Sequence, residues 1–184
     1  MPGRVFVITG PSGVGKGTLI RELLARVPGL ELAVSATTRA PRAGERDGVD
    51  YHFLDEAEFD RRVEEGDFLE HAVYSGSRYG TLRSELEKRL ATGASVVLEI
   101  EVQGARQVAK TMPDAVRIFI APPSEETLRE RLERRGTDDP EQINRRLEVA
   151  KEEMAAASEF PHVIRNDDLA RAADELERVV RSAL

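Results

Sequence analysis

The residues with the clearest capacity for chemistry form a glycine-rich stretch near the start of the chain. It consists of Gly10, Pro11, Ser12, Gly13, Val14, Gly15, Lys16, Gly17 and Thr18. Glycines let successive backbone N–H groups turn toward one anion, and a lysine at this spacing adds a full charge for the β- and γ-phosphates of a nucleotide. The apolar run 5–9 predicts a strand before it, and residues 16–27 predict a helix after it. A plain strand-to-helix turn is the alternative, but it would not need Lys16, so we interpret the stretch as a phosphate-binding loop.

The residue after the lysine departs from the usual pattern. A hydroxyl is expected there to help hold Mg²⁺, whereas this chain has Gly17, with Thr18 next. The G-K-G-T sequence resembles the loops of adenylate-kinase-like proteins, so the site is retained. We expect Mg²⁺ to bind together with ATP, held largely by phosphate oxygens and water.

Two arginine-bearing segments could bind further phosphate groups. Arg39 and Arg42 flank Pro41, and guanidinium groups bind phosphate oxygens bidentately. Taken alone, the segment around Arg39 and Arg42 would be interpreted as a solvent-exposed loop. The predicted helices 124–135 and from 140 onward carry six arginines: Arg129, Arg131, Arg134, Arg135, Arg145 and Arg146. These could form a lid over a phosphate loop or pair with the many glutamates nearby, and the sequence leaves both readings open.

Carboxylates follow a second apolar run. Residues 95–101 predict a buried strand that ends in Glu99 and Glu101 on one face, because strand side chains alternate. Ligands bind at the carboxyl ends of parallel strands. A glutamate that merely ends the strand is the alternative, but three apolar residues before Glu99 favour a functional role. Glu70 lies in another predicted strand, 68–74.

Composition limits the classes of protein to consider. With 184 residues, 40% hydrophobic and 33% charged, the chain fits one ordinary globular domain. It has no cysteine, which excludes disulfides, thiolate metal sites and a cysteine nucleophile. A net charge of −7 argues against a general nucleic-acid binder. We see neither a signal peptide nor an apolar run of the ~20 residues that span a membrane, and no obligate protein partner is evident, so we expect a cytoplasmic protein.

Alternating strands and helices predict an α/β fold with a parallel sheet flanked by helices. After the first strand and helix we expect a strand at 32–34, an edge strand at 50–53 and a helix capped by Asp55 that ends at Gly66. A turn at 79–81 then precedes a helix over 82–91. The remaining expected elements are a helix at 104–112, a strand at 116–120, the two arginine-bearing helices, a strand at 163–164 and a final helix from 169.

These motifs together resemble the guanylate kinase family over nearly the whole chain. The matching segments read GPSGVGKGT, S-A-T-T-R-x-P-R-x-G-E, D-Y-x-F, E-H-A-x-Y…Y-G-T, E-I-E-V-Q-G-A, R-G-T-D and N-D-D-L. The resemblance implies a single domain with a P-loop NTPase-type parallel sheet core at 1–35, 82–123 and 159–184. It also implies a small β-rich GMP-binding insertion at 36–81 and a helical lid at 124–158.

The resemblance also implies residue roles. Five residues would hold the GMP phosphate: Ser35, Arg39, Arg42, Tyr51 and Tyr79. Glu70, Thr81 and Glu101 would contact guanine. Residues 10–18, Arg131, Arg135 and Asn166 would bind ATP, with Asn166 near adenine. Lys16, Arg39, Arg42, Arg135 and Arg146 would act on the transferring phosphate. Thr18 and Glu99, the latter through water, would lie near the metal. The family commonly has aspartates where Glu99 and Glu101 stand, so these side chains are one methylene longer.

The implied reaction is ATP + GMP ⇌ ADP + GDP. Its acceptor is a phosphate oxygen that is ionised at neutral pH, so no general base is needed and catalysis consists of positioning and charge neutralisation. Another nucleoside-monophosphate kinase is one alternative, which the acceptor segment disfavours. A non-catalytic guanylate-kinase-like binding module is a second, but such modules typically lose the phosphate loop that this chain retains.

Overall fold

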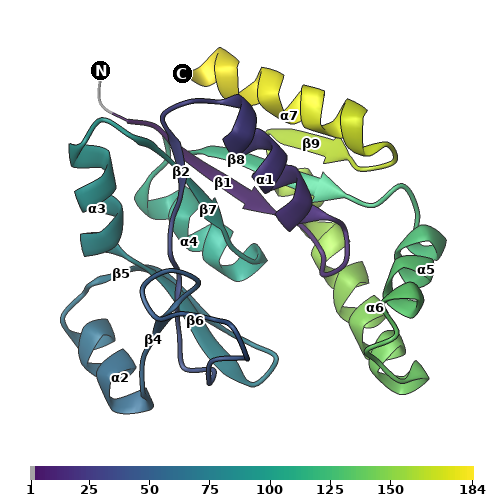
Figure 1. Ribbon diagram of the computed structural model, residues 1–184, viewed down its shortest axis with the longest axis horizontal. Helices are drawn as coiled ribbons and strands as arrows, with labels where there is room; N and C mark the ends of the chain where they lie inside the picture. Colours follow the sequence, from purple (N-terminus) through teal and green to yellow (C-terminus); the bar gives the residue numbers. More distant parts are fainter. Residues whose placement is uncertain (1–2) are drawn as a thin grey trace. The chain divides into compact units, whose positions relative to one another are not determined.

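The computed structural model describes residues 3–184 and has the α/β architecture expected from the sequence (Figure 1). The chain divides into two compact units. The first unit contains the residues up to Val5 together with Gly29–Ala115, and the second contains Phe6–Pro28 and Val116–Leu184. The three-part division into core, insertion and lid is a different scheme, and it stays a prediction.

The second unit is built on three parallel strands and two long helices. The elements are β1 (Val5–Thr9), β8 (Val116–Ala121), β9 (His162–Arg165), α1 (Lys16–Arg26) and α7 (Leu169–Ala183). β8 lies between β1 and β9, and all of β1 is buried. The helices α1 and α7 lie side by side, with a 2.7 Å ion pair between Arg26 and Asp174. A buried parallel sheet covered by helices explains why β1 reads as an unbroken apolar run.

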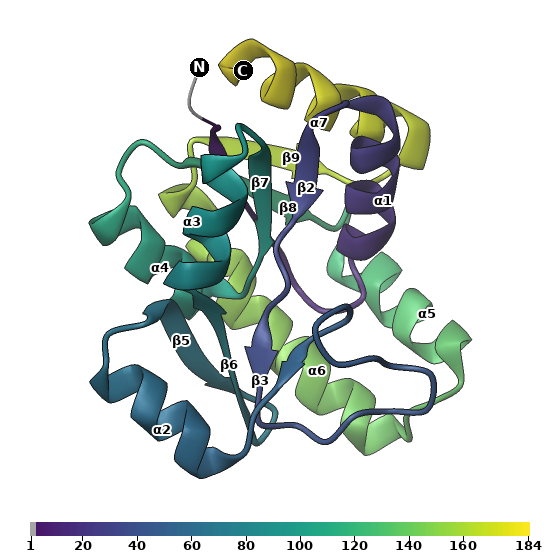
Figure 2. The same cartoon turned by 60° about the vertical axis from the view of Figure 1, so that its left-hand side comes forward.

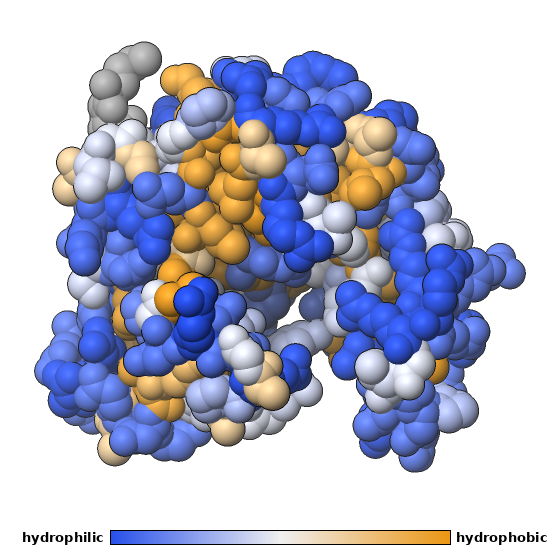
Figure 3. Space-filling model, viewed as in Figure 1, coloured by the Kyte–Doolittle hydropathy of each residue, from blue (hydrophilic) through white to orange (hydrophobic). Residues whose placement is uncertain are grey.

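The helices α5 (Glu125–Arg135) and α6 (Pro140–Ala155), followed by a short 3₁₀ turn at Ala156–Glu159, complete the second unit. Ser124 caps α5 by accepting the Thr127 N–H, Gly136 ends it at φ 63°, and Asp139 forms a capping box with Gln142. These predicted boundaries are confirmed. The two helices share an apolar core of Leu128, Leu132, Ile143, Leu147 and Ala150. Their outer surface is mostly hydrophilic (Figure 3).

The first unit holds a parallel pair, β2 (Leu30–Leu32) and β7 (Ser95–Glu99), with helices α3 (Arg83–Ala91) and α4 (Val102–Thr111). The start of β1 belongs to this unit, and the Arg4 carbonyl accepts the Val96 N–H at 2.8 Å. Since β1 continues beside β8, the parallel strands follow the order β2-β7-β1-β8-β9. The α/β class with a parallel sheet is thus confirmed.

A separate four-stranded sheet lies in the first unit (Figure 2). Its order is β4 (His52–Phe53), β3 (Ala36–Thr37), β6 (Ser77–Leu82) and β5 (Phe68–Tyr74), and α2 (Glu56–Glu64) packs against it. Ala36, Phe59, Phe68 and Leu82 form the apolar core between sheet and helix. This sheet occupies the segment in which the sequence predicted a β-rich insertion.

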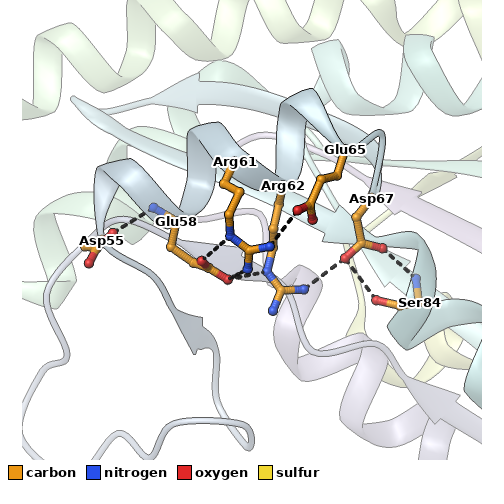
Figure 4. A network of polar contacts seen from close by, with 7 residues as sticks. All are labelled: Asp55, Glu58, Arg61, Arg62, Glu65, Asp67 and Ser84. Carbon is orange, nitrogen blue, oxygen red and sulfur yellow. Dashed lines mark hydrogen bonds and ion pairs between the residues drawn. The ribbon is translucent and has the colours of Figure 1, made fainter.

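A polar network holds α2 in place (Figure 4). The Asp55 side chain accepts the Glu58 N–H, as predicted for a helix cap. Arg62 pairs with Glu58 and, at 2.9 Å, with Asp67. The same Asp67 carboxylate accepts hydrogen bonds from the backbone N–H and the hydroxyl of Ser84. Asp67 therefore connects α2 to the beginning of α3.

Two strand predictions were wrong. The second strand is β2 at Leu30–Leu32 and not 32–34, because Gly29 at φ 78° turns the chain directly into the sheet. Residues 79–81 are not a turn but lie in β6, and the real turn is Ser75–Gly76, both with positive φ. Two such residues form the tight hairpin turn that matches strand twist. Gly80 is needed for packing, since a Cβ there would lie 2.6 Å from the Phe68 ring.

Several predicted boundaries also move. The edge strand is shorter than 50–53, and β4 covers only His52–Phe53. The strand predicted at 95–101 ends at Glu99, and α4 begins at Val102 and not at 104, because the Glu101 side chain caps this helix. Glu99 and Glu101 therefore do not share one strand face. No helix within residues 3–184 combines the length and apolar character needed to cross a membrane.

Candidate active site

The phosphate-binding loop joins β1 to α1 within the second unit. Gly13 and Gly15 have φ values of 85° and 90°, which side-chain-bearing residues rarely adopt. Gly15 stands at the cap position of α1 and offers no side chain to its first-turn N–H groups. Those donors, with the positive end of the helix dipole, are free to bind an anion.

Close packing fixes this loop against the end of the parallel strands. A Cβ on Gly10 would lie 2.4 Å from the carbonyl oxygen of Ile120, and a Cβ on Gly15 would lie 2.6 Å from Nδ2 of Asn166. Either contact is too short for a real carbon atom. Glycine is therefore required at both positions for the loop to keep this path.

Lys16 lies back over the loop that precedes it. Its Nζ donates to the Gly10 carbonyl at 3.1 Å, and its side chain is half-buried. An ammonium group has three donors, so two remain for phosphate oxygens. The lysine is thus oriented toward the loop before any nucleotide is bound.

Arg131 and Asn166 both hold the middle of the loop. The Val14 carbonyl accepts from Arg131 Nη1 at 3.1 Å and from Asn166 Nδ2 at 2.8 Å. Arg131 Nη2 also donates to the Asn166 carbonyl at 2.9 Å, and Asn166 is buried. In this structure these two predicted ATP ligands support the loop's backbone.

The other predicted lid arginines are less constrained. Arg135 is exposed at the end of α5. Arg146 of α6 is half-buried and pairs with Asp138 at 3.1 Å. Unlike Arg131, neither side chain makes a hydrogen bond to the phosphate-binding loop or to Asn166 within the part of the chain that the structure describes.

In the first unit, Arg39 is held by a carboxylate that sequence reasoning did not single out. Its two terminal nitrogens bind Glu45 bidentately at 3.0 and 2.9 Å, and the same carboxylate accepts the Arg42 N–H at 2.8 Å. Glu45 therefore fixes the guanidinium plane of Arg39. The signal was present in the sequence, because Glu45 lies six residues beyond Arg39 in the same polar segment. The Arg42 side chain is exposed.

Two tyrosines stand beside Arg39. The guanidinium carbon lies 5.1 Å from the centre of the Tyr51 ring, and the Tyr51 and Tyr79 rings meet edge-on at 6.1 Å. Burial raises the pKa of the Tyr51 hydroxyl, and hydrogen bonding to Arg39 opposes this rise. The Ser35 carbonyl accepts the His52 N–H at 2.8 Å, which fixes the chain before β3. The structure thus gathers Arg39, Tyr51 and Tyr79, as the resemblance implied.

Glu70 is a buried carboxylate on β5. Only 3% of the residue is exposed, and Thr81 Oγ1 donates to its Oε1 at 2.7 Å. Burial raises the pKa of the Glu70 carboxyl to about 7, with the Thr81 hydrogen bond opposing the rise and the Glu101 charge adding to it. A buried acid with a single side-chain donor is costly unless it serves a ligand.

Glu101 lies beside Glu70 at the start of α4. Its two oxygens accept from the N–H groups of Gln103 and Gly104 at 2.8 and 2.7 Å. A Cβ on Gly104 would lie 2.2 Å from Oε2 of Glu70 and 3.1 Å from Oε1 of Glu101. Glycine at 104 therefore leaves room for both carboxylates, and the three predicted guanine-contacting residues are together.

The predicted metal ligands have the chemistry that Mg²⁺ prefers. Thr18 and Glu99 are oxygen donors; the Thr18 hydroxyl accepts from Arg21 at 3.2 Å and Glu99 is exposed. Residues 3–184 contain no cluster of three or more His, Asp or Glu side chains that could hold a metal by themselves. This donor set fits an ion that keeps water and takes most ligands from a nucleotide's phosphates.

A cavity of about 350 Å³ lies elsewhere in the first unit and includes none of these residues. It is lined by Asp47, His52, Phe53, Leu54, Arg62, Leu82, Ser84, Glu85 and Lys88. None of the predicted site residues therefore lines this cavity.

Comparison with known proteins identifies the family. A family model described as guanylate kinase matches residues 2–183. A guanylate kinase of Thermobifida fusca is 54% identical over 175 residues, which is 95% of this chain and 89% of the relative. One of Gloeobacter violaceus is also 54% identical, covering 96% of this chain and 86% of the relative. The crystal structure of guanylate kinase from Anaplasma phagocytophilum superposes with a TM-score of 0.80 at 36% identity, over 98% of this chain and 86% of that one. The chain therefore belongs to the guanylate kinase family.

Proposed function

We propose that this chain transfers the γ-phosphoryl group of ATP to a phosphate oxygen of GMP and releases ADP and GDP. The family supports this activity. The observation in this chain that carries it is Glu70, a buried carboxylate on β5 beside Thr81 and Glu101. Guanine presents N1–H and its 2-amino group side by side, and a carboxylate accepts both. Adenine has an acceptor at N1, so an ionised Glu70 would meet a lone pair there and could not make both hydrogen bonds.

The two nucleotides would use different units. The phosphate of GMP would bind Arg39, Tyr51 and Tyr79, with Arg42 and Ser35 completing the set. ATP would bind with its phosphates on the loop 10–18. Arg135 and Arg146 would neutralise the transferring group, and Arg131 would reach the phosphates only by exchanging one of its bonds to Val14 or Asn166.

Lys16 would contribute charge where it grows during transfer. Its remaining donors would bind β- and γ-oxygens and stabilise the negative charge that builds up on the leaving ADP in the transition state. Mg²⁺ would supply further charge neutralisation, and Thr18 and Glu99 are the residues that would lie near it, Glu99 through water. The acceptor oxygen is already ionised, so this mechanism assigns no general base.

We place the reaction in the cytoplasm, where ATP and GMP are available together, and the proposal needs no nucleic acid, membrane or obligate protein partner. The test is ADP formation from ATP with Mg²⁺ in the presence of GMP, AMP, UMP or no acceptor. GMP should stimulate ADP release strongly, with GDP as the second product. Equal stimulation by AMP would indicate another monophosphate kinase, and no stimulation would indicate a binding module.

A further inference from the structure

Gln107 of α4 binds the outer edge of β5. β5 is the last strand of its sheet, so its outer backbone groups have no partner strand. At His71, Gln107 fills this place: its Oε1 accepts the His71 N–H at 3.0 Å, and its Nε2 donates to the His71 carbonyl at 2.7 Å. Both ends of one amide are used, which fixes the separation of β5 and α4 at this residue.

This contact adjoins the Glu70 carboxylate. His71 directly follows Glu70 along the strand, and Gly104, against which the Glu70 carboxylate packs, lies three residues before Gln107 on α4. Residues three apart share one face of a helix. The Gln107 amide and the Glu70 carboxylate are therefore neighbours on one β5–α4 interface.

Two features of this interface would allow the Glu70 side chain to move away from α4. When Glu70 is ionised, its carboxylate and that of Glu101 carry like charges beside Gly104, and their repulsion favours separation of β5 from α4. The register between β5 and β6 also shifts between Phe68 and Glu70, so the strand ladder is interrupted just before Glu70. Gln107 supplies two hydrogen bonds that resist this separation.

We propose that Gln107 is a positioning residue for guanine recognition, because its amide holds β5 on α4 so that the Glu70 carboxylate meets both donors of the base. The inference rests on the proposed function. If Gln107 is lost, Glu70 should no longer accept from N1–H and the 2-amino group together. The penalty should be larger for GMP than for IMP, whose base lacks the 2-amino group.

The test is the ratio of kcat/KM for GMP to kcat/KM for IMP in Gln107→Met. Methionine keeps the length of the side chain but makes neither backbone hydrogen bond. We expect kcat/KM for GMP to fall about tenfold or more, as expected for loss of one hydrogen bond to a charged group, with a smaller fall for IMP and an unchanged KM for ATP. The ratio does not depend on the fraction of folded enzyme, so a loss of stability alone would leave it unchanged.

Gln107→Asn is the second variant, because it retains the amide but is one methylene too short to make both bonds. It should lower the ratio in the same direction. Lys110→Met, on an exposed residue of the same helix, is the control and should leave the ratio unchanged. A GMP-to-IMP ratio within twofold of wild type in both Gln107 variants, or failure of both to fold, would overturn the positioning role. Failure of the proposed function is seen separately, as absence of GDP formation by the wild-type enzyme.

Discussion

At the scale of single residues, the proposed role of the buried Glu70 carboxylate predicts that guanine binding depends on pH. Its pKa is raised to about 7, chiefly by burial, so roughly half of the unliganded molecules carry a neutral acid near neutral pH. Only the ionised form accepts from both donors of guanine. GMP affinity should therefore fall as the pH drops through 7, by about tenfold between pH 8 and pH 6.

Isothermal titration of GMP across this pH range tests the prediction. GMP binding at pH 7 should also release about half a proton per GMP bound, which is visible as a dependence of the measured enthalpy on the buffer. The phosphate of GMP titrates nearby, so Glu70→Gln is the matched control, and it should flatten the part of the profile that belongs to the base. An unchanged profile in Glu70→Gln would contradict the assignment.

Lys16 should be required for turnover but not for folding. Its side chain is half-buried and its one described hydrogen bond is to the Gly10 carbonyl, so its loss leaves no buried group unpaired inside a core. Lys16→Ala should lower kcat by about 10²-fold or more, because it removes charge stabilisation of the transition state. Steady-state kinetics alongside thermal unfolding separates the two effects. Turnover within tenfold of wild type would remove Lys16 from the mechanism.

The two glycines around Lys16 should respond differently to substitution. Gly15 has φ 90°, and a Cβ there would lie 2.6 Å from Nδ2 of Asn166, so Gly15→Ala should displace Asn166 and raise KM for ATP strongly. Gly17 lies inside α1 and is not among the positive-φ residues, so Gly17→Ser should keep most of the activity with a modest change in Mg²⁺ dependence. Measuring the activity of both variants as a function of ATP and of Mg²⁺ concentration compares the two effects. Inactive Gly17→Ser would show that the loop needs glycine there.

At the scale of elements, local signals gave correct boundaries where one side chain decides them. Ser124, Asp139 and Gly136 cap or end their helices through bonds or a φ value that each residue type favours, so sequence alone places α5 and α6. The hairpin between β5 and β6 was missed although Ser75–Gly76 is a dipeptide typical of turns, because the turn was assigned to the glycine in Tyr79–Thr81 instead. Strand pairing places Tyr79–Thr81 inside β6.

Residue roles set by tertiary contacts were also beyond local signals. Glu101 was expected to continue a strand, but its oxygens cap α4. Gln107 binds a backbone group thirty-six residues away, and neither its type nor its spacing marks it in the sequence. The resemblance to a family located the candidate site, whereas the supporting contacts needed the fold.

The α5–α6 pair offers a test of how an element supports the phosphate loop. Leu132 and Leu147 are both buried in the core of this pair, so alanine at either should lower the free energy of unfolding by about 2–5 kcal/mol. Leu132 Cδ2 also lies 3.0 Å from where a Gly13 Cβ would stand. Leu132→Ala should therefore raise KM for ATP as well, whereas Leu147→Ala should not. Chemical denaturation measures the loss of stability, and steady-state kinetics measure KM for ATP. If the two variants raised KM for ATP equally, Leu132 would not support the phosphate loop.

At the scale of the whole molecule, the candidate ATP and GMP residues belong to different units of the chain. The phosphate loop, Arg131 and Asn166 lie in the second unit, and Arg39, Glu70 and Glu101 lie in the first. Direct phosphoryl transfer requires the reacting atoms to approach to about 3–3.5 Å with water excluded. Binding of both substrates should therefore order segments 36–81 and 124–158, which carry the arginines proposed to bind phosphate.

Hydrogen exchange tests this expectation segment by segment. GMP alone should slow exchange mainly in 36–81, because most of the residues proposed to bind guanine and the GMP phosphate lie there. GMP together with an unreactive ATP analogue and Mg²⁺ should slow exchange in 124–158 as well, and by more than the analogue alone, since ordering by one ligand lowers the entropic cost for the other. The buried β1 is the internal reference and should not change. If protection in 124–158 were the same with and without GMP, the two substrates would bind independently, and water would have to be excluded from the transferring phosphate by another part of the chain.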